Sequence, residues 1–170
     1  KYENEGGPGL TQLFTLVQQS QEAELDLRTL MASQVLFWML RATDGHAKNF
    51  SIQLLPGKAG RFRLTPMYDV MSAYPVVGSG PTQWAARDLK LAMALVGKNR
   101  HYHVHAIQRR HFNSTAQKLG YGGNAEPLLN ELVERTPAVV KQMQAELPAG
   151  FSQEVADKVL GGLLAAARAL

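Results

Sequence analysis

The stretch Arg41-Ala-Thr-Asp-Gly-His-Ala-Lys-Asn-Phe-Ser51, with the later string Leu64-Thr-Pro-Met-Tyr-Asp-Val-Met-Ser72, decides how this chain is interpreted. Together they place three oxygen-bearing side chains in order: Asp44, then Asn49, then Asp69. Phosphoryl transfer in protein kinases uses this order, in which one Asp faces the substrate hydroxyl and a later Asn and Asp hold Mg²⁺ against the nucleotide phosphates. The pattern therefore predicts a phosphoryl-transfer site.

The residues between Asn49 and Asp69 predict a small hairpin. Residues 50–55 and 61–65 show the apolar alternation of short strands, and Pro56-Gly-Lys-Ala-Gly60 between them is rich in turn formers. An antiparallel pair returns the chain to its starting point, so we expect Asn49 and Asp69 to meet around one cation. Mg²⁺ takes oxygen ligands and keeps several waters, so one amide and one carboxylate suffice when phosphate oxygens complete its shell.

The rest of the chain is mainly helical in its apolar periodicity. Helices are expected over residues 11–20, 22–42 and 107–119, from Asn124 through a restart or kink at Thr136-Pro137, and from about Ser152 onward. Residues 71–84 read as a loop, and the apolar run 89–96 fits either a strand or the start of a helix. The expected fold class is mainly α within α+β, a helical bundle with one small β-hairpin, in which helix 22–42 leads directly to Asp44.

Composition and length argue against several classes of protein. A chain of 170 residues suits one compact domain, and it contains no cysteine for a disulfide framework or thiolate metal site. No long apolar run or secretory leader is visible, so we expect no membrane partner and a cytoplasmic location. The net charge of +4 permits contact with nucleic acid but does not require it.

Five stretches of the chain carry a resemblance to a known family. The strings Asp44-Gly-His-Ala-Lys-Asn49 and Leu64-Thr-Pro-Met-Tyr-Asp69-Val closely resemble the HipA family of bacterial serine/threonine kinases, the toxin half of HipBA toxin–antitoxin pairs. Lys1-Tyr-Glu-Asn-Glu-Gly-Gly-Pro8, Asp88-Leu-Lys-Leu-Ala-Met93 and Arg110-His-Phe112 also look like the carboxy-terminal half of that family.

The resemblance implies a kinase-like C-terminal lobe and a role for each motif residue. Asp44 would be the catalytic base, and Asn49 and Asp69 would bind Mg²⁺ on ATP. ATP contacts are implied along the whole loop and at the later Tyr-Asp pair, that is, at His46, Ala47, Lys48, Asn49, Tyr68 and Asp69. His46 could instead orient Asp44, and Lys48 could equally be a solvated surface amine.

The resemblance also implies partners. They are a HipB-like antitoxin, operator DNA reached mainly through that antitoxin with weak direct contact, and a protein substrate. In the family, that substrate is a translation-related protein such as glutamyl-tRNA synthetase, and its phosphorylation arrests growth.

The expected organisation is a piece of a longer protein. Residues 1–170 read as the C-terminal kinase lobe, with 1–9 as a linker, 10–120 as the catalytic subdomain and 121–170 as C-terminal helices. A kinase also needs a Gly-rich loop over the phosphates and a strand-borne Lys, and neither is found in this sequence. The fragment alone is therefore expected to be inactive.

Two other classes of function stay open. The pattern Asp-x-His-x-x-Asn is shared with phosphoinositide-type lipid kinases, so a lipid or small-molecule kinase is one alternative. A helical binding module without catalysis is the other. Two further features are weaker indications of function. At alternate positions stand His101, His103 and His105, which would share one face of a strand and could bind a metal ion. A basic cluster that could contact phosphates consists of Arg100, Arg109, Arg110 and Lys118.

Overall fold

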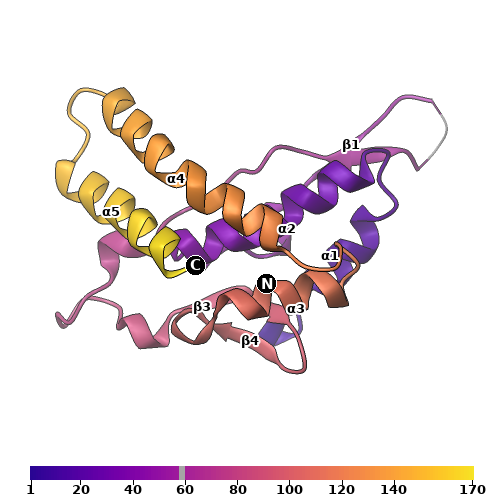
Figure 1. The fold of residues 1–170 in the computed structure, drawn as a ribbon, viewed down its shortest axis with the longest axis horizontal. Helices are drawn as coiled ribbons and strands as arrows, with labels where there is room; N and C mark the ends of the chain where they lie inside the picture. Colours follow the sequence, from indigo (N-terminus) through magenta and orange to yellow (C-terminus); the bar gives the residue numbers. More distant parts are fainter. Residues whose placement is uncertain (58–59) are drawn as a thin grey trace.

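Helix α2, Ala23–Leu40, runs through the centre of the molecule, and the other elements pack around it (Figure 1). The computed structural model describes residues 1–57 and 60–170. Its longer helices are α1 Leu10–Val17, α2, α3 Arg109–Lys118, α4 Glu126–Glu146 and α5 Gln153–Ala169. Its strands are β1 Ile52–Leu54, β2 Phe62–Leu64, β3 Lys90–Val96 and β4 Arg100–His103, and its 3₁₀ turns are η1 Glu3–Glu5, η2 Ala47–Asn49, η3 Tyr74–Val76, η4 Ala86–Asp88 and η5 Val104–Ala106.

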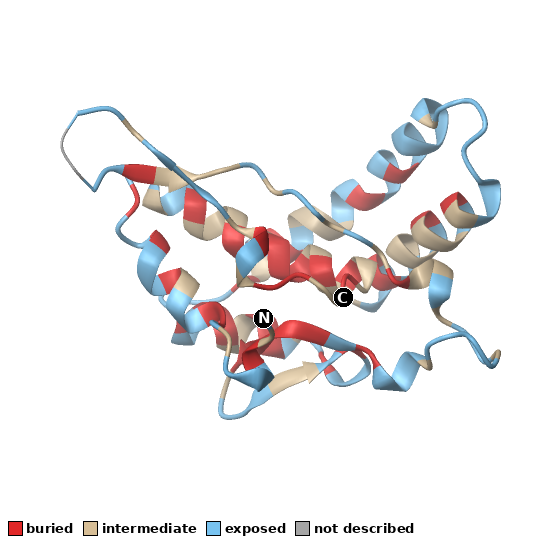
Figure 2. Cartoon of the chain, turned by 180° about the vertical axis from the view of Figure 1, so that it is seen from behind, coloured by how far each residue is buried: buried red, intermediate tan, exposed pale blue. Residues whose placement is uncertain are grey.

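Burial explains why α2 is central. Leu30, Met31, Val35 and Met39 are fully buried, and even the polar Gln34 is 1% exposed. A helix that is buried on most of its circumference must be covered by several neighbours. Helices α1 and α5 and strand β3 supply that cover, and buried residues follow α2 along its length (Figure 2).

Two hairpins flank this core. Strands β1 and β2 pair antiparallel, with Ile52 opposite Leu64 and Leu54 opposite Phe62. The predicted hairpin is therefore confirmed, with shorter strands, while residues 58–59 of its predicted turn lie outside the described part of the chain. The second hairpin, β3 with β4, was not predicted. The run 89–96 that fitted two interpretations is a strand, and six of its seven residues from Leu91 onward are buried.

The C-terminal helices form an antiparallel pair, α4 with α5 (Figure 1). Helix α4 is continuous through Pro137, so the helix does not restart there, and the alternative of a kink stays a prediction. The N-cap position of α4 is Ala125 rather than Asn124, although the Asn124 side chain accepts a hydrogen bond from the Glu126 N–H at 2.9 Å. The predicted start of α5 is confirmed. Ser152 is its N-cap residue, and the Ser152 hydroxyl accepts a hydrogen bond from the Val155 N–H.

No helix in the described part of the chain is long and apolar enough to cross a membrane.

Candidate active site

The N-terminal end of α2 is joined to the first hairpin by hydrogen bonds. Asp26 is 4% exposed, and its carboxylate accepts hydrogen bonds from the Ser20 hydroxyl and from the Leu64 backbone N–H. A buried carboxylate is stable only when such partners satisfy it. Strand β2 is thereby fixed to the helix, and the hairpin is placed relative to the loop at the other end of α2.

The C-terminal end of α2 is joined to the chain segments on both sides of the hairpin. Arg41 terminates the helix in a left-handed conformation, with φ of 51°. The Ser72 hydroxyl donates to the Leu40 carbonyl at 2.7 Å, and the Ala73 N–H donates to the Arg41 carbonyl at 3.2 Å. The chain that follows Asp69 is therefore tied to the same helix end from which Asp44 departs.

A close approach explains the glycine after Asp44. A Cβ atom on Gly45 would lie 2.5 Å from the ring of Phe37, which is itself buried in the core. Such a contact is too short for any side chain, so residue 45 must be glycine for the loop to lie against α2. The Asp-Gly pair is thus part of the packing of the loop as well as a turn signal.

Asn49 and Asp69 meet as the hairpin predicted. The Asn49 amide donates from Nδ2 to Oδ2 of Asp69 at 2.7 Å. Asn49 is 4% exposed, and its Oδ1 has no hydrogen-bond partner among the described residues. Asp69 is exposed and adopts φ of 56°, a conformation that costs energy for a residue other than glycine and that clusters at functional sites.

This pair fits a magnesium site. An unpartnered amide oxygen beside an exposed carboxylate supplies two hard oxygen ligands, which Mg²⁺ prefers, with room for water and phosphate oxygens. A buried acceptor without a partner is otherwise unfavourable, so a cation would satisfy Asn49 Oδ1. Whether the two residues bind metal stays a prediction.

Asp44 is held by the beginning of the chain. The Tyr2 hydroxyl donates to Oδ1 of Asp44 at 2.7 Å, and Lys1 Nζ lies 2.9 Å from Oδ1 and 3.0 Å from Oδ2. Burial raises the pKa of the Asp44 carboxyl, but the hydrogen bonds from Tyr2 and Lys1 outweigh it and hold that pKa below its ordinary value. Asp44 is therefore kept charged at neutral pH.

These two partners of Asp44 do not follow from any sequence pattern. The sequence predicts a linker over residues 1–9, whereas the contact from Tyr2 to Asp44 spans 42 positions along the chain. The only signal was the string Lys1-Tyr-Glu-Asn-Glu-Gly-Gly-Pro8, whose resemblance to the family gave no hint of its contacts.

The remaining predicted site residues lie close to these groups. His46 is buried, with Nε2 at 3.8 Å from Oδ1 of Asp44, so it lies where it could orient that carboxylate. Ala47 begins the turn η2, and Lys48 is exposed. The Tyr68 hydroxyl lies 2.8 Å from the Ser51 hydroxyl and 3.1 Å from the Lys48 carbonyl, which brings Tyr68 against the loop. Their contacts with ATP stay predictions.

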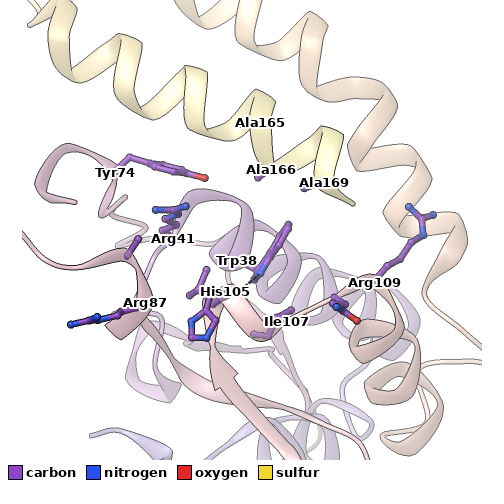
Figure 3. Close-up of a pocket in the computed structure, with 13 residues that line it drawn as sticks. Trp38, Arg41, Tyr74, Arg87, His105, Ile107, Arg109, Ala165, Ala166 and Ala169 are labelled. Carbon is purple, nitrogen blue, oxygen red and sulfur yellow. Dashed lines mark hydrogen bonds between the residues drawn. The ribbon is translucent and has the colours of Figure 1, made fainter. Parts of the chain in front are cut away.

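A cleft elsewhere on the molecule has a different character. It has a volume of about 860 Å³ and lies between the end of α2, η3, η4, η5 and α5 (Figure 3). Its lining residues include four basic side chains and no carboxylate, and the four are Arg41, Arg87, His105 and Arg109. The Arg41 guanidinium lies 4.8 Å from the Tyr74 ring centre. Because these side chains are basic, the cleft suits an anion rather than Mg²⁺, and Asp44, Asn49 and Asp69 are not among its lining residues.

The histidines after β3 do not form a metal site. His101 stacks on His111 with ring centres 3.9 Å apart, while the rings of His103 and His105 are 5.5 Å apart. Within residues 1–57 and 60–170, no three His, Cys, Asp or Glu side chains gather as metal ligands do. His103, at the end of β4, and His105, in η5, are both exposed.

Most of the basic cluster suggested for phosphate contact is engaged within the protein. Arg100 pairs with Glu3, Arg109 pairs with Glu126, and Lys118 Nζ donates to the Gly97 carbonyl. These partners compete with any external phosphate. Direct contact with DNA through these side chains stays a prediction.

The fold is a mainly helical lobe with two small hairpins, and a loop Asp and an Asn–Asp pair lie at one end of its central helix. Residues 1–143 match the HipA-like C-terminal domain family, so the chain belongs to that family. Among solved structures it resembles HipA of Shewanella oneidensis MR-1, determined in a complex of HipA, HipB and operator DNA.

That match has a TM-score of 0.74 at 18% sequence identity, which is a likeness of fold. It covers 99% of this chain but only 39% of the Shewanella chain.

Proposed function

We propose that this chain is the C-terminal lobe of a HipA-type serine/threonine kinase that transfers the γ-phosphate of ATP to a protein hydroxyl. The observation that carries the proposal is the arrangement around α2, in which a charged Asp44 and the Asn49–Asp69 pair emerge from one rigid support. Family membership over residues 1–143 supports the same function.

The chemistry follows from the types of group. Asp44 orients a serine or threonine hydroxyl and accepts its proton as the oxygen attacks the γ-phosphorus, while the bond from that phosphorus to the ADP oxygen breaks. Asn49 Oδ1 and the Asp69 carboxylate would hold Mg²⁺, which neutralises phosphate charge when bound. Lys48, which is exposed on the same loop, would contribute positive charge toward the nucleotide.

Substrate and partners follow from the family. The proposed target is a translation-related protein such as glutamyl-tRNA synthetase, whose phosphorylation would arrest growth. The Shewanella HipA was determined with HipB and operator DNA. We propose that this protein likewise binds a HipB-like antitoxin and reaches operator DNA mainly through it.

The test is γ-phosphate transfer by the full-length protein that contains this lobe. Wild type is compared with Asp44→Gln and Asp69→Asn, and bacterial lysate and lipid vesicles are offered separately with γ-labelled ATP. We expect labelled protein with wild type and a loss of at least about 100-fold in both variants. Labelled lipid in place of protein would favour the lipid-kinase alternative, and transfer that survives Asp44→Gln would contradict the role of Asp44.

A helical binding module is the second candidate function, and the basic cleft is the observation that favours it. A cleft lined by Trp38, Arg41, Arg87 and His105 could hold an anionic segment of a partner without any catalysis. If the full-length protein transfers no phosphate and Arg41→Gln weakens binding to a partner while Asp44→Gln does not, this function replaces the kinase.

A further inference from the structure

We propose that Tyr2 is a positioning residue for Asp44, and that residues 1–9 form a structural brace that presents its hydroxyl to the catalytic loop. The proposal rests on the proposed kinase function, since it assigns Tyr2 a role in the same site. It adds a residue from outside the Asp-x-His-x-x-Asn motif to that site.

Two contacts join Tyr2 to the loop. Its hydroxyl donates to Oδ1 of Asp44 at 2.7 Å, the usual length for a bond from a hydroxyl to an oxygen. Its ring meets the buried His46 ring edge-on, with ring centres 6.1 Å apart. The hydrogen bond fixes the rotation of the carboxylate, and the ring contact fixes the next ionisable side chain of the loop.

Tyr2 is itself held in place by its neighbour Glu3. Glu3 is 8% exposed, accepts a hydrogen bond from the Ala94 N–H of β3 at 2.7 Å, and pairs with Arg100 of β4. A Cβ atom on Gly9 would lie 2.2 Å from the Glu3 carboxyl carbon, so only glycine at position 9 allows this packing. The second hairpin therefore anchors the segment that carries Tyr2.

The same anchoring limits how Tyr2 can move. The Gly7 N–H donates to the Tyr2 carbonyl at 2.9 Å and closes the segment on itself. Because both the backbone and the side chain of Tyr2 are bonded, the hydroxyl is presented to Asp44 in one direction. A catalytic group needs support of this kind to stay within about 0.5 Å of its working position.

The hydrogen bond leaves the base free to act. Each carboxylate oxygen has two acceptor positions. Oδ1 faces Tyr2 and Lys1, whereas Oδ2 faces Lys1 at 3.0 Å and keeps a position that can receive a substrate hydroxyl. The hydrogen bond to Asp44 raises the pKa of Tyr2, with burial acting in the same direction, so its hydroxyl keeps its proton at neutral pH. The titratable groups seen facing Asp44 are Lys1 and Tyr2 of the brace and His46 of the loop.

The test compares Tyr2→Phe with Tyr121→Phe in the full-length protein, with kcat and KM for ATP measured across a pH series. Tyr121 is a matched control, because it is a partly buried tyrosine packed on the core that interacts with Arg28 and is not among the groups acting on Asp44. We expect Tyr2→Phe to lower kcat about five- to tenfold, as for the loss of one hydrogen bond, with little change in KM. The acid limb of the kcat profile should move to higher pH, because Asp44 loses a bond that favours its charged form.

The outcomes separate this inference from the proposed function. If wild type transfers no phosphate, or if Asp44→Gln leaves the transfer unchanged, the proposed kinase function is wrong. An active, Asp44-dependent wild type with an unchanged kcat and pH profile in Tyr2→Phe overturns the positioning role alone. A higher kcat in Tyr2→Phe also overturns it, since the contact would then inhibit. A lower melting temperature with unchanged kinetics would show that Tyr2 is merely structural.

Discussion

At the scale of single residues, Asp44 should make stability depend on pH in the acid range. Because folding lowers the pKa of Asp44, the charged carboxylate stabilises the fold above its unfolded pKa of about 3.9. This contribution is lost as the pH falls through the lower, folded value. The difference in free energy of unfolding between wild type and Asp44→Asn should therefore be larger at pH 6 than at pH 2.5, as measured by urea titration.

A second variant checks the cause of that pH dependence. Tyr2→Phe removes one hydrogen bond to the charged carboxylate, so its difference from wild type should also shrink on acidification. Differences that stay constant between pH 6 and pH 2.5 in both variants would contradict the lowered pKa of Asp44.

The unpartnered oxygen of Asn49 leads to a prediction about magnesium. Asn49→Leu keeps the approximate size of the side chain but removes Oδ1 and the bond to Asp69. In the full-length protein we expect the Mg²⁺ concentration for half-maximal transfer to rise about tenfold or more, because one oxygen ligand is lost. Thr65→Val, which removes another buried oxygen without a partner, is the control and should leave the magnesium dependence unchanged.

Some residue contacts follow from local sequence patterns, and others do not. The pairing of Asn49 with Asp69 followed from a local hairpin, whose length and turn residues are visible in twenty consecutive positions. The bond from Tyr2 to Asp44 joins distant segments, and its geometry depends on the anchoring of Glu3 by the second hairpin. No local pattern encodes such a contact.

At the scale of elements, the hydrogen bonds that join α2 to the first hairpin should dominate local stability. Asp26→Ala leaves the Ser20 hydroxyl and the Leu64 N–H without their acceptor in a buried place. We expect a loss of about 2–4 kcal/mol in the free energy of unfolding, measured with urea. Glu24→Ala removes the same charge from an exposed position on the same helix and should change stability by less than about 0.5 kcal/mol.

The apolar run 89–96 shows why one element could not be assigned in advance. A continuous apolar segment has no period that distinguishes a strand from a buried helix. Strand β3 is selected by partners outside the run: β4 pairs along it, Glu3 accepts from the Ala94 N–H, and Thr115 accepts from the Val96 N–H. Helix periods, by contrast, placed α1, α2 and α5 within a few residues of their observed bounds.

At the scale of the whole molecule, the prediction concerns what this lobe does alone. It spans 39% of the length of the Shewanella HipA chain, and its sequence contains no Gly-rich phosphate loop followed by a suitable Lys. The proposed site therefore has a base and metal ligands but lacks the groups that cradle the β- and γ-phosphates. We expect the 170-residue chain to bind Mg·ATP weakly, at least about tenfold more weakly than the full-length protein, and to transfer no phosphate.

Calorimetric titration of both proteins with Mg·ATP, beside a γ-labelled transfer assay, measures these two properties. Asp69→Asn in the 170-residue chain is the control for the weak binding, which should depend on that carboxylate. Weak binding abolished by Asp69→Asn, with transfer only by the longer protein, would place metal ligation in this lobe and phosphate binding outside it. Efficient transfer by the 170 residues alone would contradict that division, because the lobe would then contain every group that the reaction needs.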